Sequence, residues 1–374
     1  MGNTGLSDVI RFGDREVYIE TSLDEEQQKI VTKVLDNSYL LSSYEKPVGE
    51  AAGEGIQLAE AEKQHREVVA DWKHFFYLYE KVKSSRHAPS AVRLGRLMLE
   101  RNLFPEAVEC FRDALRWDPE NVDAVINLAR AYYLTELFDE AVSTLRRYED
   151  RFGTFPDVQF WLGAAYLGMQ EFPRAIQHLE RALEINPHYD AAHFLLGKTY
   201  VSSLAHSYET EELIPGPLRQ KKALGHLQRA IDLNPLYNQA ATRQAMKEIQ
   251  NGRYDVALEK LEEVELFPKE VENHFDERFY LDFLFGGKSK DDELIENYIR
   301  QLQQRLKEHP DFPDLHNQLG VAYLIQCRNM FLKAMEQFRK ALKLNPNFQA
   351  AKRNLKLAEN EGKGFIILLR ALLK

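Results

Sequence analysis

The sequence predicts a mainly α-helical protein, an α-solenoid of antiparallel helix pairs preceded by a small three-stranded antiparallel β element. The main evidence is a set of apolar and small residues that recurs every 34 positions. The leucines Leu94, Leu128, Leu162 and Leu196 show this period. A fixed period of this size is typical of an array of two-helix units, in which each unit covers an apolar face of its neighbour.

The composition is that of a protein with an extended core. The chain has 374 residues, 44% of them hydrophobic, which is enough to supply a core along a whole array. The formal net charge of -9 disfavours nucleic acid as a partner, because phosphate groups would be repelled. The two cysteines, Cys110 and Cys327, have no Cys or His at metal-ligand spacing, which favours two reduced thiols.

The pattern of apolar residues gives no sign of a membrane segment. The first residues, MGNTGLSDVIRFGDRE, lack a basic start followed by an apolar run. No stretch approaches the ~20 apolar residues that span a bilayer. We therefore expect a cytoplasmic protein without an integral membrane segment.

Residues 1–46 are predicted to form β-strands. The runs REVYIET and QQKIVTKVL alternate between apolar and polar residues, so that Val17 and Ile19 share one face, and YLLSSYE supplies a third strand. The segment Asp36-Asn37-Ser38 is typical of a tight hairpin turn. Because three short strands are marginal alone, we expect this sheet to dock on the following helix or on another chain.

Residues 47–87 are predicted to contain a glycine-rich linker and one long helix. Apolar side chains recur there at helical spacing, with Trp72, Phe75 and Phe76 at the centre of the stripe. We expect this helix to cap the first repeat. A stripe that binds a partner is the alternative.

The repeat array is predicted to run from residue 88 to residue 348. Small residues such as Gly95 and Gly163 let the two helices of a unit approach closely. The predicted units are 88–121, 122–155, 156–189, 190–237 with an insertion at about 202–218, 238–271, a degenerate unit 272–312, and 313–348. Residues 349–374 are predicted to form C-terminal capping helices, of which Phe365–Leu369 is apolar on all sides.

The repeat residues of one unit are Leu162, Gly163, Tyr166, Ala175, Ala182 and Pro187. Their spacing resembles that of the tetratricopeptide repeat over about 88–348. In that family the first helices of successive units line a concave groove, which receives a peptide or a helix of a partner.

One subgroup of that family clamps a partner's terminal carboxylate with Lys and Asn residues. The five matching positions of this chain are occupied by Val92, Arg96, Asn127, Asp157 and Trp161. Only Asn127 fits the subgroup, so we do not expect a carboxylate clamp.

The groove that the resemblance implies has an apolar row and a basic row. The fifth residues of the first four units form the apolar row: Val92, Ile126, Phe160 and Phe194. The ninth residues form the mostly basic row: Arg96, Arg130, Ala164 and Lys198. Further predicted contact residues are Asn127, Tyr133, Trp161 and Leu167.

Two such rows favour a partner segment with apolar anchors and acidic residues beside them. The alternative is that the apolar row packs against neighbouring helices. In that case Asp123 and Asp157 would neutralise the arginines.

The sequence contains no motif for catalysis, for a cofactor or for a metal. There is no His-Glu-x-x-His, no Gly-x-Ser-x-Gly and no Gly-x-Gly-x-x-Gly. We therefore expect a non-enzymatic scaffold or adaptor that binds another protein in its groove. The alternative is a structural assembly subunit, which self-associates through the β element and the C-terminal apolar helix.

Overall fold

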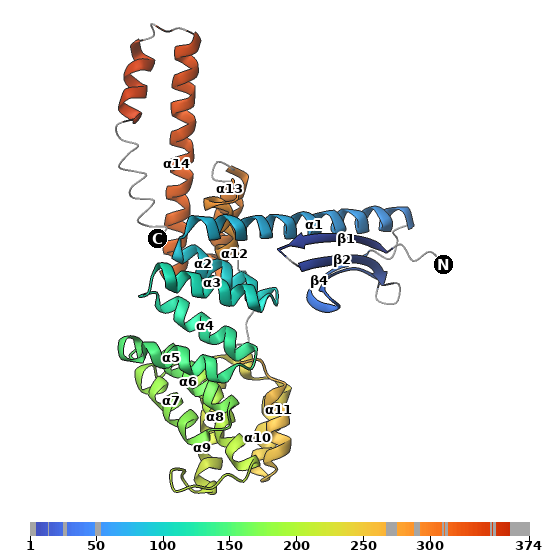
Figure 1. The fold of residues 1–374 in the computed structure, drawn as a ribbon, viewed down its shortest axis with the longest axis vertical. Coiled ribbons are helices and arrows are strands. Elements are labelled where there is room, and N and C mark those ends of the chain that lie inside the picture. Colours follow the sequence, from blue (N-terminus) through green and yellow to red (C-terminus); the bar gives the residue numbers. More distant parts are fainter. Residues whose placement is uncertain are drawn as a thin grey trace. The chain divides into compact units, whose positions relative to one another are not determined.

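A computed structural model describes most of the chain (Figure 1). The described residues are 5–13, 15–24, 28–48, 54–266, 275–287, 292–308, 310, 313–344, 346 and 349–359. The chain divides into two compact units, of which the first contains Met1–Val69 and Val82–Asn273 and the second contains Ala70–Lys81 and His274–Lys374. The 32-residue helix α1 (Glu54–Ser85) contributes residues to both units.

The first unit begins with a four-stranded antiparallel sheet in the order β1-β2-β3-β4. Its strands are β1 (Leu6–Phe12), β2 (Arg15–Asp24), β3 (Lys29–Asp36) and β4 (Tyr39–Pro47). The prediction of three strands was wrong, because it missed β1. The sequence pair Gly13-Asp14 between two alternating runs is typical of a two-residue hairpin turn and could have found it. Gly13 has a φ of 58°, which suits such a turn.

The predicted turn between β3 and β4 is confirmed. Asn37 and Ser38 have φ values of 45° and 74°, so both adopt the left-handed conformation that two-residue hairpin turns require. The predicted face of β2 is confirmed as well, since Val17 and Ile19 are fully buried.

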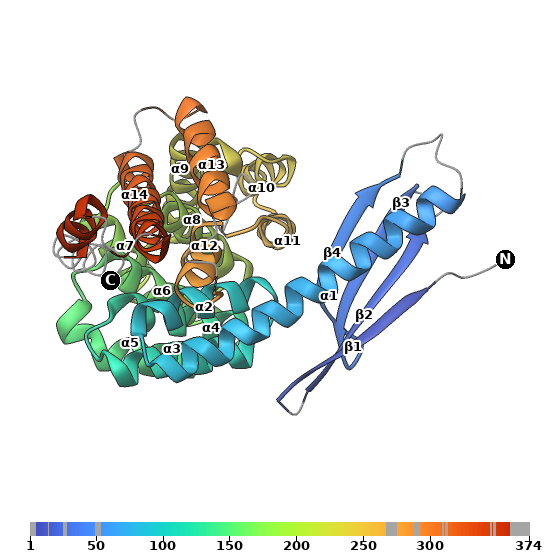
Figure 2. The same cartoon turned by 90° about the horizontal axis from the view of Figure 1, so that it is seen from above.

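One face of the sheet is covered by the first half of α1 (Figures 1 and 2). Apolar contacts there join Ile30 to Ala61 of α1. A polar network lies beside them: Thr21 Oγ1 is 2.9 Å from His65 Nδ1, and Gln64 Nε2 donates to Thr32 Oγ1 over 3.1 Å. Because buried polar groups need partners, this network fixes which residues of α1 lie over which strands. The expected docking of the sheet on the following helix is confirmed.

The rest of the first unit is the predicted solenoid of helix pairs. The pairs are α2 (Ala88–Glu100) with α3 (Phe104–Trp117), α4 (Val122–Leu134) with α5 (Phe138–Phe152), α6 (Pro156–Gly168) with α7 (Phe172–Ile185), α8 (Asp190–Ala205) with α9 (Gly216–Leu233), and α10 (Ala240–Gln250) with α11 (Tyr254–Glu262). A short 3₁₀ helix, η1 (Pro235–Tyr237), precedes α10.

The turns inside these pairs share one backbone feature. A residue with φ between 47° and 75° follows the first helix in all five pairs: Asn102, Glu136, Gln170, Ser207 and Gly252. A left-handed residue at this place ends the helix and reverses the chain. In the α8–α9 pair the inserted residues are held in addition by Arg219, which is fully buried and donates to the backbone oxygens of Ser203 and Tyr208 over 3.3 and 2.9 Å.

The last residues of α1 contact the first helix pair. Lys83 Nζ forms an ion pair with Glu109 of α3. The capping role predicted for this helix stays a prediction.

The second unit contains α12 (Phe275–Leu284), α13 (Asp292–Glu308) and α14 (Pro313–Leu344) together with residues 70–81 of α1. Its core includes Phe279 and Tyr298, whose rings stack 3.9 Å apart. The helix pair predicted for 313–348 is wrong, because α14 is one helix of 32 residues. The segment LIQCRNMFLKAMEQF contains neither Gly nor Pro, so nothing in it ends the helix.

Residues 349–359 are helical, as expected for the C-terminal segment. The apolar segment Phe365–Leu369 lies outside the described residues. Within the described part of the chain, every helix is too short or too polar to cross a membrane.

Candidate interaction surface

The predicted contact residues lie on the first helices of four successive pairs. These helices are neighbours in space, since α4 contacts both α2 and α6, and α6 contacts α8. The side chains on them therefore form one continuous strip of the first unit. Their burial decides which of them a partner can touch.

Most of the predicted apolar row is buried. Phe160 is fully buried and its ring stacks on Tyr189 at 5.1 Å, while Phe194 is 1% exposed and stacks on Tyr237 at 4.8 Å. Each tyrosine lies just before the first helix of the next pair, so each stack packs one unit against the next. Phe160 and Phe194 are therefore packing residues, which corrects their assignment as partner anchors.

The remaining apolar candidates are of two kinds, buried and half-buried. Val92 is 3% exposed and Trp161 is 4% exposed, whereas Ile126 and Leu167 are only half-buried. Tyr133 is half-buried too; its ring meets that of Trp161 edge-on at 5.4 Å, and burial raises the pKa of its hydroxyl. Ile126, Tyr133 and Leu167 thus remain accessible.

The polar candidate Asn127 has a structural role. It is 6% exposed, and its Nδ2 donates to the backbone oxygen of Asp123 one turn earlier over 2.8 Å. An amide engaged in this way is already hydrogen-bonded within its own helix.

The three basic residues of the basic row are half-buried, and Ala164 is fully buried. Arg96 Nη2 lies 3.6 Å from Asp123 Oδ2, so this arginine is neutralised as the alternative interpretation expected. Asp157 has a different partner, since it accepts a hydrogen bond of 2.6 Å from the hydroxyl of Tyr189. Arg130 is half-buried on α4.

Lys198 has an unusual environment. It is half-buried on α8, and burial lowers the pKa of its ammonium group, an effect that Glu262 offsets only in part. Taking an ammonium group out of water is unfavourable unless a negative charge lies beside it. An acidic group of a ligand would supply that charge.

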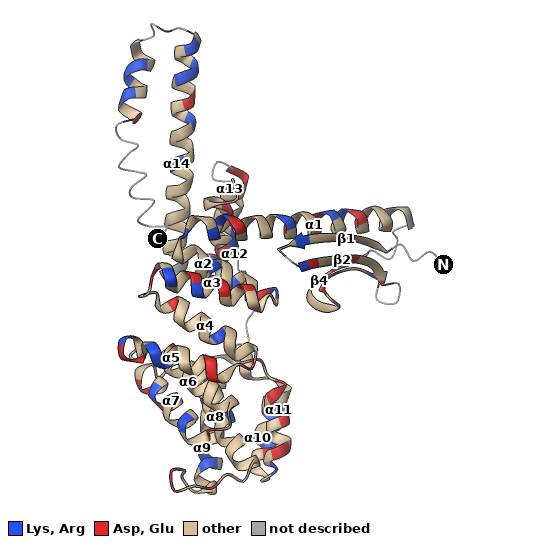
Figure 3. Cartoon of the chain, viewed as in Figure 1, with Lys and Arg blue, Asp and Glu red and all other residues tan. Residues whose placement is uncertain are grey.

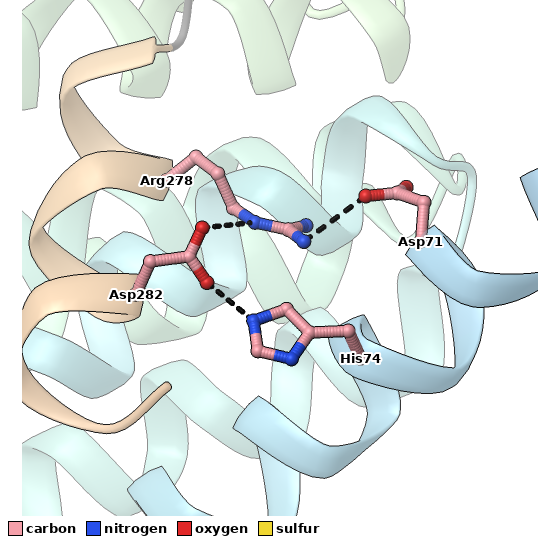
Figure 4. A network of polar contacts seen from close by, with 4 residues as sticks. All are labelled: Asp71, His74, Arg278 and Asp282. Carbon is pink, nitrogen blue, oxygen red and sulfur yellow. Dashed lines mark hydrogen bonds and ion pairs between the residues drawn. The ribbon is translucent and has the colours of Figure 1, made fainter. Parts of the chain in front are cut away.

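A second cluster of titratable side chains lies in the second unit (Figure 4). Asp282 of α12 accepts hydrogen bonds from Arg278 Nε at 3.1 Å and from His74 Nε2 at 2.5 Å, and Arg278 Nη2 lies 3.0 Å from Asp71. All four groups are paired with each other, and the Asp282 side chain is only 7% exposed. This cluster therefore ties α12 to the middle of α1 and offers no unpaired group for catalysis.

The charges of the described helices are otherwise mixed. Figure 3 shows basic and acidic residues interspersed along the ribbon of these helices. Among the described residues no group of three or more His, Cys, Asp or Glu side chains could hold a metal ion.

Models of known protein families match part of the array. Two tetratricopeptide repeat models match residues 98–160 and 156–189. The matched segments lie in the helix pairs that follow the 34-residue period most closely. A comparison with the curated proteins found no match.

Solved structures of repeat proteins resemble stretches of the chain. A thermophilic TPR protein of Thermus thermophilus is 18% identical, with 64% of this chain and 100% of that chain covered and a TM-score of 0.36. PilF of Pseudomonas aeruginosa is 18% identical, with coverages of 63% and 97% and a TM-score of 0.37. YrrB, described as a TPR protein with an unusual peptide-binding site, is 17% identical, with coverages of 52% and 93% and a TM-score of 0.34.

Proposed function

We propose that this chain, which is a tetratricopeptide repeat protein, works as a non-enzymatic scaffold that binds a segment of another protein on the first helices of its repeats. The surface that we assign to the partner is smaller than the one that the sequence predicts. It consists of the half-buried residues Arg96, Ile126, Arg130, Tyr133, Leu167 and Lys198, which we call the inner strip.

The environment of Lys198 is the observation that carries this proposal. Its ammonium group is held in a partly buried place where the charged form is disfavoured. A carboxylate of a partner would stabilise the charged form and gain a charge-assisted hydrogen bond. Ile126 and Leu167 on neighbouring helices offer accessible apolar surface for an anchor side chain, so the preferred segment combines an apolar residue with an acidic one.

Selection from a random peptide display library tests this preference without knowledge of the partner. We expect the wild-type protein to enrich peptides that carry acidic and apolar residues. The double variant Arg130→Glu, Lys198→Glu should lose the acidic enrichment, because its inner strip now repels carboxylates.

A matched control is available on the second helices. Arg147 of α5 and Lys221 of α9 are exposed, so Arg147→Glu, Lys221→Glu changes the net charge by the same amount away from the inner strip. This control should select the same peptides as the wild type. Acidic enrichment that survives in the Arg130, Lys198 variant, with helicity unchanged by circular dichroism, would show that the inner strip is not the binding surface.

A further inference from the structure

The outer face of the N-terminal sheet, turned away from α1, carries an apolar row across all four strands. Val9 pairs in register with Tyr18, Tyr18 with Leu35, and Leu35 with Leu40. Val9 is 47% exposed and Leu40 is 45% exposed, while Tyr18 and Leu35 are half-buried. Neighbouring apolar side chains that are exposed or partly exposed on one sheet face are typical of an interaction surface.

The charges beside this row are separated by strand. One step along the sheet from Tyr18 and Leu35, Glu20 of β2 lies opposite Lys33 of β3. Both side chains are exposed on the same outer face. The second strand thus presents a negative charge and the third strand a positive one, at the same level of the sheet.

This arrangement is complementary to itself. If two copies of the sheet pack face to face about a two-fold axis that runs between β2 and β3 along the strands, each β2 lies over the partner's β3 and each β1 over the partner's β4. Tyr18 then meets the partner's Leu35, and Val9 meets the partner's Leu40. Glu20 meets the partner's Lys33 twice in the same interface. We infer that the occupant of this face is a second copy of the same chain, bound in this orientation.

The charges also disfavour the other simple arrangement. A two-fold axis that runs across the strands at the level of Tyr18 would place Glu20 over the partner's Glu16, which lies two residues before Tyr18 on the same strand. Like charges in contact oppose association. The orientation along the strands is the one that joins the apolar rows and pairs opposite charges.

The size of the face predicts a weak dimer. Four strands at about 4.8 Å spacing and roughly eight residues at 3.4 Å each give a face of about 500 Å² per copy. The interface would bury on the order of 1,000 Å² in total, which is at the lower limit for specific complexes. The dimer should therefore form and dissociate with protein concentration.

Charge reversal on the full-length protein tests the orientation, with sedimentation equilibrium as the measurement. The wild type should show a concentration-dependent monomer–dimer equilibrium. Either single variant, Glu20→Lys or Lys33→Glu, should weaken dimerisation at least tenfold, because each places like charges opposite each other twice. The double variant Glu20→Lys, Lys33→Glu restores opposite charges and should dimerise as the wild type does.

Mixing the two single variants gives the sharpest result. In the mixed dimer both introduced charges face residues of opposite sign, so the mixture should dimerise better than either variant alone. A purely structural effect on one chain would not produce this rescue. A wild-type protein that stays monomeric at every concentration, or a dimer that neither single variant weakens, would overturn the inference.

Discussion

Two segments of this chain have closely similar sequences and different structures. Residues 155–167, FPDVQFWLGAAYL, lead into and form most of α6, and residues 312–324, FPDLHNQLGVAYL, lead into the first part of α14. In the first segment α7 packs so closely that a Cβ on Gly163 would lie 2.6 Å from Leu179 Cγ. A Cβ on Gly320 would meet no described atom within 4 Å.

The difference arises in the residues that come after each segment. After α6 the chain reverses through Gln170, whose φ is 59°, and the second helix returns along the first. After residue 324 the chain continues as one helix to Leu344. The shared motif thus encodes a first helix and a site for close approach, whereas the return of the chain depends on the residues after the motif.

The two units also differ in the polar groups that hold their helices. In the repeats, neutral buried side chains join neighbouring helices, as in the hydrogen bond of 2.8 Å between His178 Nδ1 and Gln159 Oε1, although the buried Arg219 of α9 is charged. In the second unit, the Asp282 carboxylate ties α12 to α1 through His74, which lies 208 residues earlier, and Arg278 of α12 pairs with Asp71 of α1. Substitutions in each unit can therefore test this comparison separately.

The largest effect is expected for Asp282→Ala. This change removes the buried carboxylate that joins Arg278 to His74 and leaves Asp71 as the ion-pair partner of Arg278, which costs roughly 3 kcal/mol. Hydrogen exchange of the α12 amides should become much faster. Glu296→Ala on α13 removes an exposed carboxylate and is the matched control. Equal protection of α12 in both variants would contradict a role of the cluster in holding this helix.

The second prediction concerns acid stability of the repeats. Burial lowers the pKa of His178 from 6.5 to about 4, because its imidazolium form is disfavoured in the folded state. The unfolded chain takes up the proton first, so the stability of the repeats is complete above about pH 6.5 and falls as the pH drops towards 4. At about pH 4, this residue should have lowered the free energy of unfolding by about 2–3 kcal/mol.

Denaturant titrations of the wild type, His178→Gln and His188→Gln between pH 7 and pH 4 measure this effect. His178→Gln should reduce the pH dependence of the free energy of unfolding. Part of the dependence should remain, because the pKa of His226 is also lowered to about 4. His188 is exposed, and its variant should follow the wild type. A slope that is identical in all three proteins would exclude His178 as the source.

The third prediction tests the close packing of α6 against α7 at Gly163. Gly163→Ala places a methyl group against Leu179 and the backbone oxygen of Ala175, at 2.6 and 3.2 Å. Because neither neighbour can move freely, overpacking should destabilise the first unit by about 1–2 kcal/mol. The midpoint of urea unfolding, followed by far-UV circular dichroism, is the measurement. A variant as stable as the wild type would mean that α6 and α7 can separate without cost.

Much of the fold could be predicted from the sequence, because the period of 34 depends on local residues that each unit repeats. The strand β1 was missed because Ser7 and Asp8 interrupt a short run, although Gly13 marks its end. The burial of Phe160 could not be predicted, because the residue that covers it, Tyr189, belongs to the next unit. That position is not always aromatic, since Asn121 occupies it two periods earlier. The contact of His74 with Asp282 depends on how segments far apart in sequence come together.

The sequence also predicts only part of the candidate surface. The positions on the first helices are right for a strip that runs across neighbouring units, but sequence spacing cannot tell a residue that faces a ligand from one that faces the next unit. The two classes separate only when burial is known. Lys198 is half-buried and Phe194, one turn earlier on α8, is not accessible.

The smallest effect, and the one of opposite sign, is expected for Gly320→Ala. No described atom lies within 4 Å of the added methyl group, and the residue is inside a long helix, where alanine is favoured over glycine by about 1 kcal/mol. The variant should therefore be slightly more stable, whereas Gly163→Ala in the matching sequence is less stable. Hydrogen exchange of the amides around residue 320 should slow by a factor of a few, because local opening of α14 becomes less favourable. If Gly320→Ala instead destabilised the protein as Gly163→Ala does, a second helix would have to pack against α14 at this glycine, and the contrast between the two segments would not hold.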